Sequence, residues 1–259
     1  SQRMSLRLSL RIPLEIPMTA PLMLEVSNLK KSFGSVIVAN GFDLEVRTGE
    51  ALGILGPNGA GKTTFFNMIA GIAPPDSGQI KLGGRDITKA TPHERAHAGI
   101  GRSFQIPQPF ENLTVYENLL VGAVYGQGVR ERDAVQMCGE ILENTQMAKR
   151  ANALAGSLSL LERKRLELAR ALATKPKLLL LDEIAGGLTE GECHALIATV
   201  KQVHASGTTI VWIEHVVHAL MAVVTRLIVL NGGHKIADGL PSEVIAQQDV
   251  RQIYLGITV

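Results

Sequence analysis

The stretch that decides the fold reads Gly56-Pro-Asn-Gly-Ala-Gly-Lys-Thr-Thr64. It follows an apolar run, Ala51–Leu55, and precedes a segment of helical character, Phe65–Ala70. This order of strand, glycine-rich loop and helix is the context in which the pattern G-x-x-x-x-G-K-[ST] binds phosphate. Glycines let backbone N–H groups converge on an anion, and a helix N-terminus adds unpaired N–H groups and the positive end of its dipole. The sequence therefore predicts a nucleoside triphosphate site.

The residues of this loop have distinct expected roles. Lys62 is expected to hold the β- and γ-phosphates, and the Thr63 hydroxyl is expected to ligate Mg²⁺. ATP and Mg²⁺ are thus the predicted cofactors. The nucleotide is expected to contact the whole loop, which comprises Gly56, Pro57, Asn58, Gly59, Ala60, Gly61, Lys62, Thr63 and Thr64.

A second chemical element is a pair of carboxylates after the apolar run Leu178–Leu181. A buried strand that ends in Asp182 and Glu183 delivers both to the carboxyl edge of a sheet, where a P-loop also opens. Asp182 is expected to bind Mg²⁺ through water. Glu183 is expected to polarise the water that attacks the γ-phosphate, a general-base role. An acidic loop without function is the less favoured interpretation.

Composition limits the class of protein. The chain has 259 residues, enough for one large domain or two lobes that bury about 70–75% of the unfolded surface. Its net charge is +2 and its basic residues form no concentrated stripe, so no nucleic-acid footprint is predicted. Cys138 and Cys193 have no metal-binding spacing and suit a reducing compartment. No apolar run approaches the roughly 18 residues that span a bilayer.

Two kinds of strand are predicted. Short alternating segments separated by glycines indicate antiparallel pieces at residues 24–26, 36–38, 42–46 and 80–82. Continuous apolar runs indicate parallel strands buried on both faces, at residues 51–55, 178–181, 209–213 and 227–230. Helical patterns lie between them, which predicts an α/β fold: a P-loop, RecA-like parallel core with an antiparallel β subdomain and a helical subdomain.

The predicted domains follow from this layout. Residues 1–22 are predicted to be a disordered tail, with Met18 or Met23 as a plausible true start, because prolines interrupt the alternating pattern. Residues 23–259 are predicted to form one nucleotide-binding domain. Its core lobe comprises residues 23–105 and 158–259, and residues 106–157 form a mostly helical subdomain that contains a capping box at Thr114–Glu117.

These motifs together resemble the ATPase subunit of an ABC transporter, from about Met23 to Val259. Walker A corresponds to Gly56–Thr63 and Walker B to Leu178–Asp182. The resemblance implies that Gln105 is the Q-loop glutamine, with a catalytic and a Mg²⁺-binding role. It also implies that His215 is the switch histidine and that Phe33 stacks on adenine. The resemblance also implies that Ser159 begins the signature helix, which is expected to contact the ATP of a partner subunit.

Finer features resemble importers of branched-chain amino acids. They are Arg102–Gln105, Phe110–Leu119, Asp182–Thr189 and Tyr254–Gly256. The resemblance implies an ATP-hydrolysing subunit that works with a second ATPase, two membrane permeases and a periplasmic binding protein, peripheral on the cytoplasmic face of the cell membrane. Ile106–Leu119 is the expected permease contact. Importers of amides or urea and a soluble non-transport ABC ATPase stay open as alternatives. The cargo, and whether the partner ATPase is an identical chain, cannot be read from the sequence.

The signature departs from the family pattern L-S-G-G-Q, because it reads Leu158-Ser-Leu-Leu-Glu162. Leu160 and Leu161 add bulk where glycine allows close approach to the partner's γ-phosphate. Ser159 and Glu162 nevertheless form a capping box that should preserve the helix N-terminus. Either this helix end alone suffices, which is the favoured interpretation, or the ATP site that it completes is impaired. Thr189 and Val216 are smaller departures, which bear on communication between the sites.

Two further interpretations are disfavoured. His93-Glu-Arg-Ala-His97 matches the zinc motif H-E-x-x-H, but a zinc protease also needs a third ligand and an open coordination position. A surface helix is the favoured interpretation of this stretch. A subunit that binds nucleotide without hydrolysis is disfavoured because Glu183 and His215 are both present.

Overall fold

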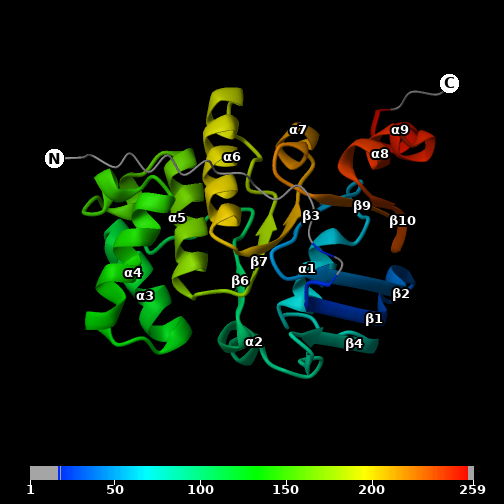
Figure 1. Cartoon of the computed structure of the whole chain (residues 1–259), viewed down its shortest axis with the longest axis horizontal. Helices are drawn as coiled ribbons and strands as arrows, with labels where there is room; N and C mark the ends of the chain where they lie inside the picture. The colour runs from blue at the N-terminus through cyan, green and yellow to red at the C-terminus, as the bar shows by residue number, and fades with distance from the viewer. Residues whose placement is uncertain (1–16, 18, 256–259) are drawn as a thin grey trace.

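The computed structural model describes residue 17 and residues 19–255 of the chain. Figure 1 shows two sheets flanked by helices, with α3 and α4 (green) at one end and the strands β1, β2 and β4 (blue to teal) toward the other. Most of the predicted tail and the predicted family feature at Gly256 lie outside the described residues. Within the described part, every helix is too short or too polar to cross a bilayer.

The larger sheet holds the P-loop and the two carboxylates at one edge. Its strand order is β10-β9-β3-β8-β7-β6, with β9 to β6 parallel and β10 antiparallel to β9. β3, β7 and β8 are buried along their whole length, as their apolar runs predict. The strands are β3 (Ala51–Leu55), β6 (Ile100–Arg102), β7 (Leu178–Asp182), β8 (Thr209–Ile213), β9 (Arg226–Asn231) and β10 (His234–Gly239).

The smaller sheet is antiparallel, in the order β2-β1-β4-β5. It contains β1 (Leu22–Phe33), β2 (Val36–Arg47), β4 (Ser77–Leu82) and β5 (Arg85–Asp86). The prediction of separate short pieces in residues 24–46 was wrong, because β1 and β2 are long strands that pair along their length. Bulges absorb the breaks in the alternating pattern: Asn28 has a φ of 48° and Gly41 a φ of 69°, and the register shifts near both.

The helices fill the space around both sheets. They are α1 (Lys62–Ile69), α2 (Pro92–Ala98), α3 (Val115–Gln127), α4 (Glu131–Asn144), α5 (Leu160–Ala173), α6 (Glu190–Ala205), α7 (Val217–Met221), α8 (Pro241–Ala246) and α9 (Gln248–Leu255). Two short 3₁₀ turns, η1 (Ala148–Arg150) and η2 (Ala155–Ser157), precede α5. The parallel sheet, the antiparallel sheet and the helical group confirm the predicted α/β fold class.

Capping boxes define where several helices begin. α2, α3, α5 and α6 each start with a Thr or Ser whose side chain accepts the N3 backbone N–H, while the N3 glutamate accepts the N–H of the cap. The boxes predicted at Thr114 and Ser159 are confirmed. α1 differs, because its N-cap is Gly61 in a left-handed conformation, without a side-chain cap or an acidic residue in its first turn.

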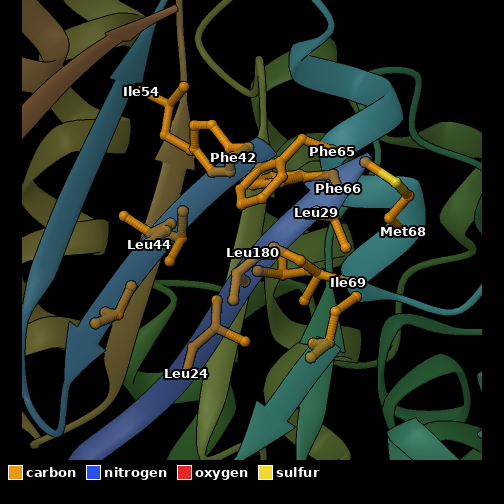
Figure 2. Packing of buried hydrophobic residues seen from close by; sticks show 14 of the residues in the cluster. Leu24, Leu29, Phe42, Leu44, Ile54, Phe65, Phe66, Met68, Ile69 and Leu180 are labelled. Carbon is orange, nitrogen blue, oxygen red and sulfur yellow. The ribbon is translucent and has the colours of Figure 1, made fainter. Parts of the chain in front are cut away.

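One hydrophobic core lies between the two sheets and surrounds α1. Figure 2 shows Phe65 and Phe66 of α1 beside Phe42 of β2 and Leu180 of β7. The rings of Phe42 and Phe65 meet edge to face, with their centroids 4.8 Å apart. The helix that follows the P-loop is therefore fixed on several sides by apolar contacts.

Two further cores complete the packing. The second lies on the other face of the large sheet, where Leu181, Trp212 and Leu196 of α6 are fully buried. The third joins α3, α4 and α5 and includes Leu119, Cys138 and Leu166. α5 shares this third core with α3 and α4, although its residues were predicted to belong to the core lobe. The predicted domain boundaries at residues 105/106 and 157/158 remain predictions.

Candidate nucleotide-binding site

The P-loop joins the fully buried β3 to α1. Lys62 is almost completely buried, and its Nζ donates to the carbonyl oxygens of Gly56 (2.6 Å) and Pro57 (3.1 Å). Burial lowers the pKa of Lys62, while the negative charges of Glu183 and Asp182 oppose this effect. The first N–H groups of α1 have no side-chain cap. Such a helix end, next to a buried cation, is suited to an anion such as a phosphate chain.

The loop borders an open cleft of about 330 Å³. Its lining consists of Val38, Asn58, Gly59, Ala60, Gly61, Lys62, Thr63, Thr64 and Glu183. Residues predicted from two distant motifs therefore share one cleft, because β3 and β7 both pair in parallel with β8 and end at the same edge of the sheet.

Glu183 is the centre of a polar cluster at this edge. Its Oε2 accepts a hydrogen bond from Gln105 Nε2 (2.7 Å) and lies 3.8 Å from His215 Nδ1. Glu183 has a φ of 46°, a left-handed conformation that is rare for a residue with a Cβ and is found at functional sites. The structure therefore brings together Glu183, Gln105 and His215, three of the predicted catalytic residues.

Asp182 makes a different contact. It is buried, and its Oδ2 accepts a hydrogen bond of 2.8 Å from Arg102 Nη2. Arg102 also donates to Asn67 Oδ1 on α1 (2.7 Å), and its guanidinium lies 5.0 Å from the ring centroid of Phe104. Arg102, at the end of β6, thus bridges Asp182 of β7 and Asn67 of α1, a role that the sequence analysis did not propose.

The donor set at the cleft is compatible with Mg²⁺, which prefers hard oxygen ligands. Arg102 occupies one carboxylate oxygen of Asp182. Within residues 17 and 19–255, no hydrogen bond or ion pair occupies its other oxygen. Thr63 is exposed and lines the cleft. The described residues contain no group of three or more His, Cys, Asp and Glu side chains that could hold a metal ion without the substrate.

Phe33 and Ser159 lie outside the cleft. Phe33 ends β1 and is 54% exposed. Phe33 pairs with Val36 of β2, the strand whose Val38 lines the cleft and lies against Gly61. Ser159 caps α5, and its own N–H donates to Glu162 Oε2 (2.9 Å). Leu160 is 43% exposed and leans on Gly187, since a Cβ on that glycine would lie 3.5 Å from Leu160 Cδ2.

Sequence reasoning missed two buried charged residues behind this cluster. Glu214 is fully buried, accepts the N–H of Ala185 (2.6 Å) and lies next to His215. Burial raises its pKa, while hydrogen bonds from backbone N–H groups lower it. Lys164 of α5 is also buried, and its Nζ donates to the carbonyl oxygen of Gln105 (3.4 Å). The sequence signal that could have identified Glu214 is a charged residue directly after an apolar strand.

The His93–His97 stretch forms the helix α2, and both of its histidines are exposed. His97 Nδ1 contacts the carbonyl oxygen of His93 (3.0 Å), and no third metal ligand joins the pair among the described residues. The stretch therefore forms the helix that the sequence analysis favours. α2 differs from the expected surface helix at one residue, because Arg95 is 1% exposed and points inward.

A substitution at Gly61 tests the described geometry of the P-loop. Its φ is +92°, and a Cβ at this position would lie 2.5 Å from the Val38 carbonyl oxygen. We expect Gly61→Ala to weaken ATP binding at least tenfold and to lower the free energy of unfolding by about 1–3 kcal/mol, because strain and a backbone clash add. Gly83→Ala is the matched control, since Gly83 has a φ of +54° and open space around it. Equal ATP affinities of the two variants, measured by calorimetry, would contradict the described loop.

Comparison with known proteins gives consistent results. The family profile described as ABC transporter matches residues 39–186. The high-affinity branched-chain amino acid transport ATP-binding protein BraF of Pseudomonas aeruginosa is 36% identical over 251 residues, which are 90% of this chain and 98% of BraF. The lipopolysaccharide export system ATP-binding protein LptB of Escherichia coli is 35% identical over 233 residues, 90% of this chain and 97% of LptB.

The relatives extend to an archaeon and to solved structures. The probable branched-chain amino acid transport ATP-binding protein LivG of Methanocaldococcus jannaschii is 34% identical over 250 residues, 90% of this chain and 97% of LivG. The structure of an ATP-binding cassette of an ABC transporter in its ADP conformation superimposes with a TM-score of 0.84 and 33% identity, over 91% of this chain and 99% of that chain.

Proposed function

The chain belongs to the ABC transporter family and is an ATPase subunit of a transporter, and from this premise we propose that it powers the import of branched-chain amino acids. The observation that carries the proposal is the similarity to BraF over 98% of its length. LivG adds support from a distant organism. The motifs Arg102–Gln105 and Phe110–Leu119, which resemble this importer subgroup, agree with it.

In the proposed reaction, the phosphate chain of ATP binds along the P-loop. Backbone N–H groups of residues 59–64 and the N-terminus of α1 surround the phosphates, and Lys62 exchanges its two carbonyl partners for phosphate oxygens. Both partners are near neighbours in the loop, so this exchange needs only a small movement of the side chain.

Glu183 then acts as the general base in this proposal. A water between Glu183 and the γ-phosphate would lose its proton to the carboxylate as it attacks. Gln105 Nε2 donates to Oε2 of Glu183 at 2.7 Å, and His215 Nδ1 lies 3.8 Å from the same oxygen, so both orient the carboxylate. The left-handed backbone at Glu183 directs the side chain into the cleft.

Thr63, Asp182 and Gln105 are the residues that would hold Mg²⁺. When bound, the ion neutralises charge on the β- and γ-phosphate oxygens. Arg102 keeps one oxygen of Asp182 engaged, and the other oxygen is the proposed ligand. This proposal requires no movement of the β7 backbone.

The proposed partners are a second ABC ATPase, two membrane permeases and, indirectly, a periplasmic binding protein, with this chain peripheral on the cytoplasmic face of the cell membrane. An apolar cavity of about 320 Å³ lies between the large sheet and the helical group, and Phe104, Phe110 and Ile72 line it. All three are about half exposed. This cavity adjoins Ile106–Leu119, where we place the permease contact. Arg102, which also lines the cavity, donates a hydrogen bond to Asp182.

The exposed N-terminus of α5 is proposed to complete the ATP site of the partner ATPase despite the variant signature. The capping box at Ser159 fixes the first turn, and we propose that its N–H groups and the helix dipole hold the γ-phosphate. Leu160→Gly is then expected to change the turnover of the assembled transporter by less than about twofold, which is under 0.5 kcal/mol. A rise of fivefold or more would show that the Leu160 side chain obstructs the site.

LptB supports a second candidate function, because it is nearly as similar as BraF and serves a lipopolysaccharide export system. The test is purification of the Glu183→Gln chain with Mg-ATP from detergent-solubilised membranes of its source organism, followed by mass spectrometry. Two polytopic permeases and a second ATPase support the importer. Recovery of lipopolysaccharide export components, of ribosomes or of DNA-repair proteins would contradict it.

A further inference from the structure

The ring of Phe33 has a cation on one of its faces. Lys31 Nζ lies 5.1 Å from the ring centroid, a distance at which an ammonium group is attracted to an aromatic face. The Phe33 side chain is nevertheless 54% exposed. One face of the ring is therefore covered by a charge, and the rest is open.

A third residue, Asp76, holds the ammonium group of Lys31 in place. Lys31 is largely buried, with a side chain that is 11% exposed, and its Nζ donates to Asp76 Oδ1 at 2.8 Å. Asp76 Oδ2 accepts hydrogen bonds from the backbone N–H (2.7 Å) and the hydroxyl (3.1 Å) of Ser32. The hydrogen bonds from Lys31 and Ser32 lower the pKa of Asp76, which keeps its carboxylate charged at neutral pH.

The same carboxylate residue also fixes the backbone before Phe33. The N–H of Asp76 donates to the carbonyl oxygen of Lys30 at 2.9 Å. Lys30, Lys31 and Ser32 are thus each tied to Asp76, and Gly34, with a φ of +60°, turns the chain directly after Phe33. Few degrees of freedom remain for the direction of the ring.

We propose that Lys31, anchored by Asp76, is a positioning residue for recognition of the nucleotide base by Phe33. The cation holds the ring and draws π-electron density to the covered face, which favours stacking of the electron-rich adenine on the open face. A ring that is already ordered also loses less conformational freedom on binding. The inference rests on the proposed stacking role of Phe33.

The experiment compares ATP with inorganic tripolyphosphate, which has the phosphates but no base. Both dissociation constants are measured by calorimetry on the full chain with Mg²⁺. Lys31→Met keeps the aliphatic stem and removes the charge, and it is expected to weaken ATP binding roughly three- to tenfold while tripolyphosphate binding stays unchanged. Asp76→Asn is expected to act in the same direction. Lys30→Met, at an exposed neighbour in β1, is the matched control and is expected to change neither constant.

A double-mutant cycle separates positioning from general electrostatics. In a Phe33→Ala chain, Lys31→Met is expected to have no further effect on ATP binding. Equal weakening of ATP and tripolyphosphate by Lys31→Met, or a persistent effect in the Phe33→Ala chain, would overturn the inference. Phe33→Ala with wild-type ATP affinity would overturn it by removing the stacking role. The inference is also overturned if the wild-type chain binds ATP no more tightly than tripolyphosphate. A wild-type chain that binds neither ligand would refute the proposed function as well.

Discussion

Glu183→Gln is expected to lower the steady-state ATP turnover of the assembled transporter by roughly 10²–10⁴-fold, while ATP still binds. The glutamine has the same size and can still accept the hydrogen bond from Gln105, which joins Glu183 at 2.7 Å. It cannot take a proton from the attacking water. The loss should therefore fall on the chemical step, and the ATP dissociation constant should change by less than about twofold.

The control for this variant is Glu140→Gln, the same chemical change at an exposed residue of α4, where Glu140 accepts a hydrogen bond from Gln136. It should leave turnover unchanged. Phosphate release is measured on the detergent-purified complex, because a subunit without its partners can be inactive. Turnover of the Glu183→Gln complex within threefold of the wild type would assign the base to another group.

Arg95→Leu is expected to lower the free energy of unfolding by about 3–5 kcal/mol. Arg95 is 1% exposed and donates to four backbone carbonyl oxygens, those of Met68 (2.6 Å), Ile69 (2.8 Å), Thr88 (2.8 Å) and Ala90 (3.0 Å). The first two belong to the last turn of α1. A cation there gives these terminal carbonyl groups a charged donor, in addition to the Gly71 N–H that Met68 already accepts, and interacts favourably with the negative end of the helix dipole.

In a thermal melt, this loss of stability should lower the melting temperature by on the order of 10 °C. Arg132→Met is the control: the Arg132 side chain is 72% exposed, so this substitution should shift the melting temperature by less than about 1 °C. Arg95→Lys should lie between the two, because one ammonium group cannot reach four carbonyl oxygens. An Arg95→Leu protein that melts within 2 °C of the wild type would contradict the described packing behind the P-loop.

The fold could be predicted where one local pattern dominated. Ala51–Leu55, Leu178–Leu181 and Thr209–Ile213 are uninterrupted apolar runs, and each is a buried parallel strand. The capping boxes at Thr114 and Ser159 also mark helix starts correctly, because their hydrogen bonds join residues three positions apart. The juxtaposition of the P-loop and Glu183 followed from the rule that parallel strands end at one edge.

The remainder depended on contacts between distant parts of the chain. β6 was missed because Ile100–Arg102 has three residues, one of them glycine and one charged, and is a strand only through pairing with β7. Arg95 has the neighbours of a surface residue, and only the end of α1 and the loop at residues 88–90 make its burial favourable. Arg102 belongs to a family motif, but its contact with Asp182 spans 80 positions, which no local pattern reveals.

The central claim, that this chain powers amino-acid import, is tested most directly by uptake of radiolabelled leucine, isoleucine and valine. The source organism is deleted for this chain and complemented with the wild type or with Glu183→Gln. We predict that the wild type restores uptake of at least one of these amino acids and that Glu183→Gln does not, although both proteins are present in equal amounts. Uptake that is unaffected by the deletion, or restored equally by Glu183→Gln, would contradict the account.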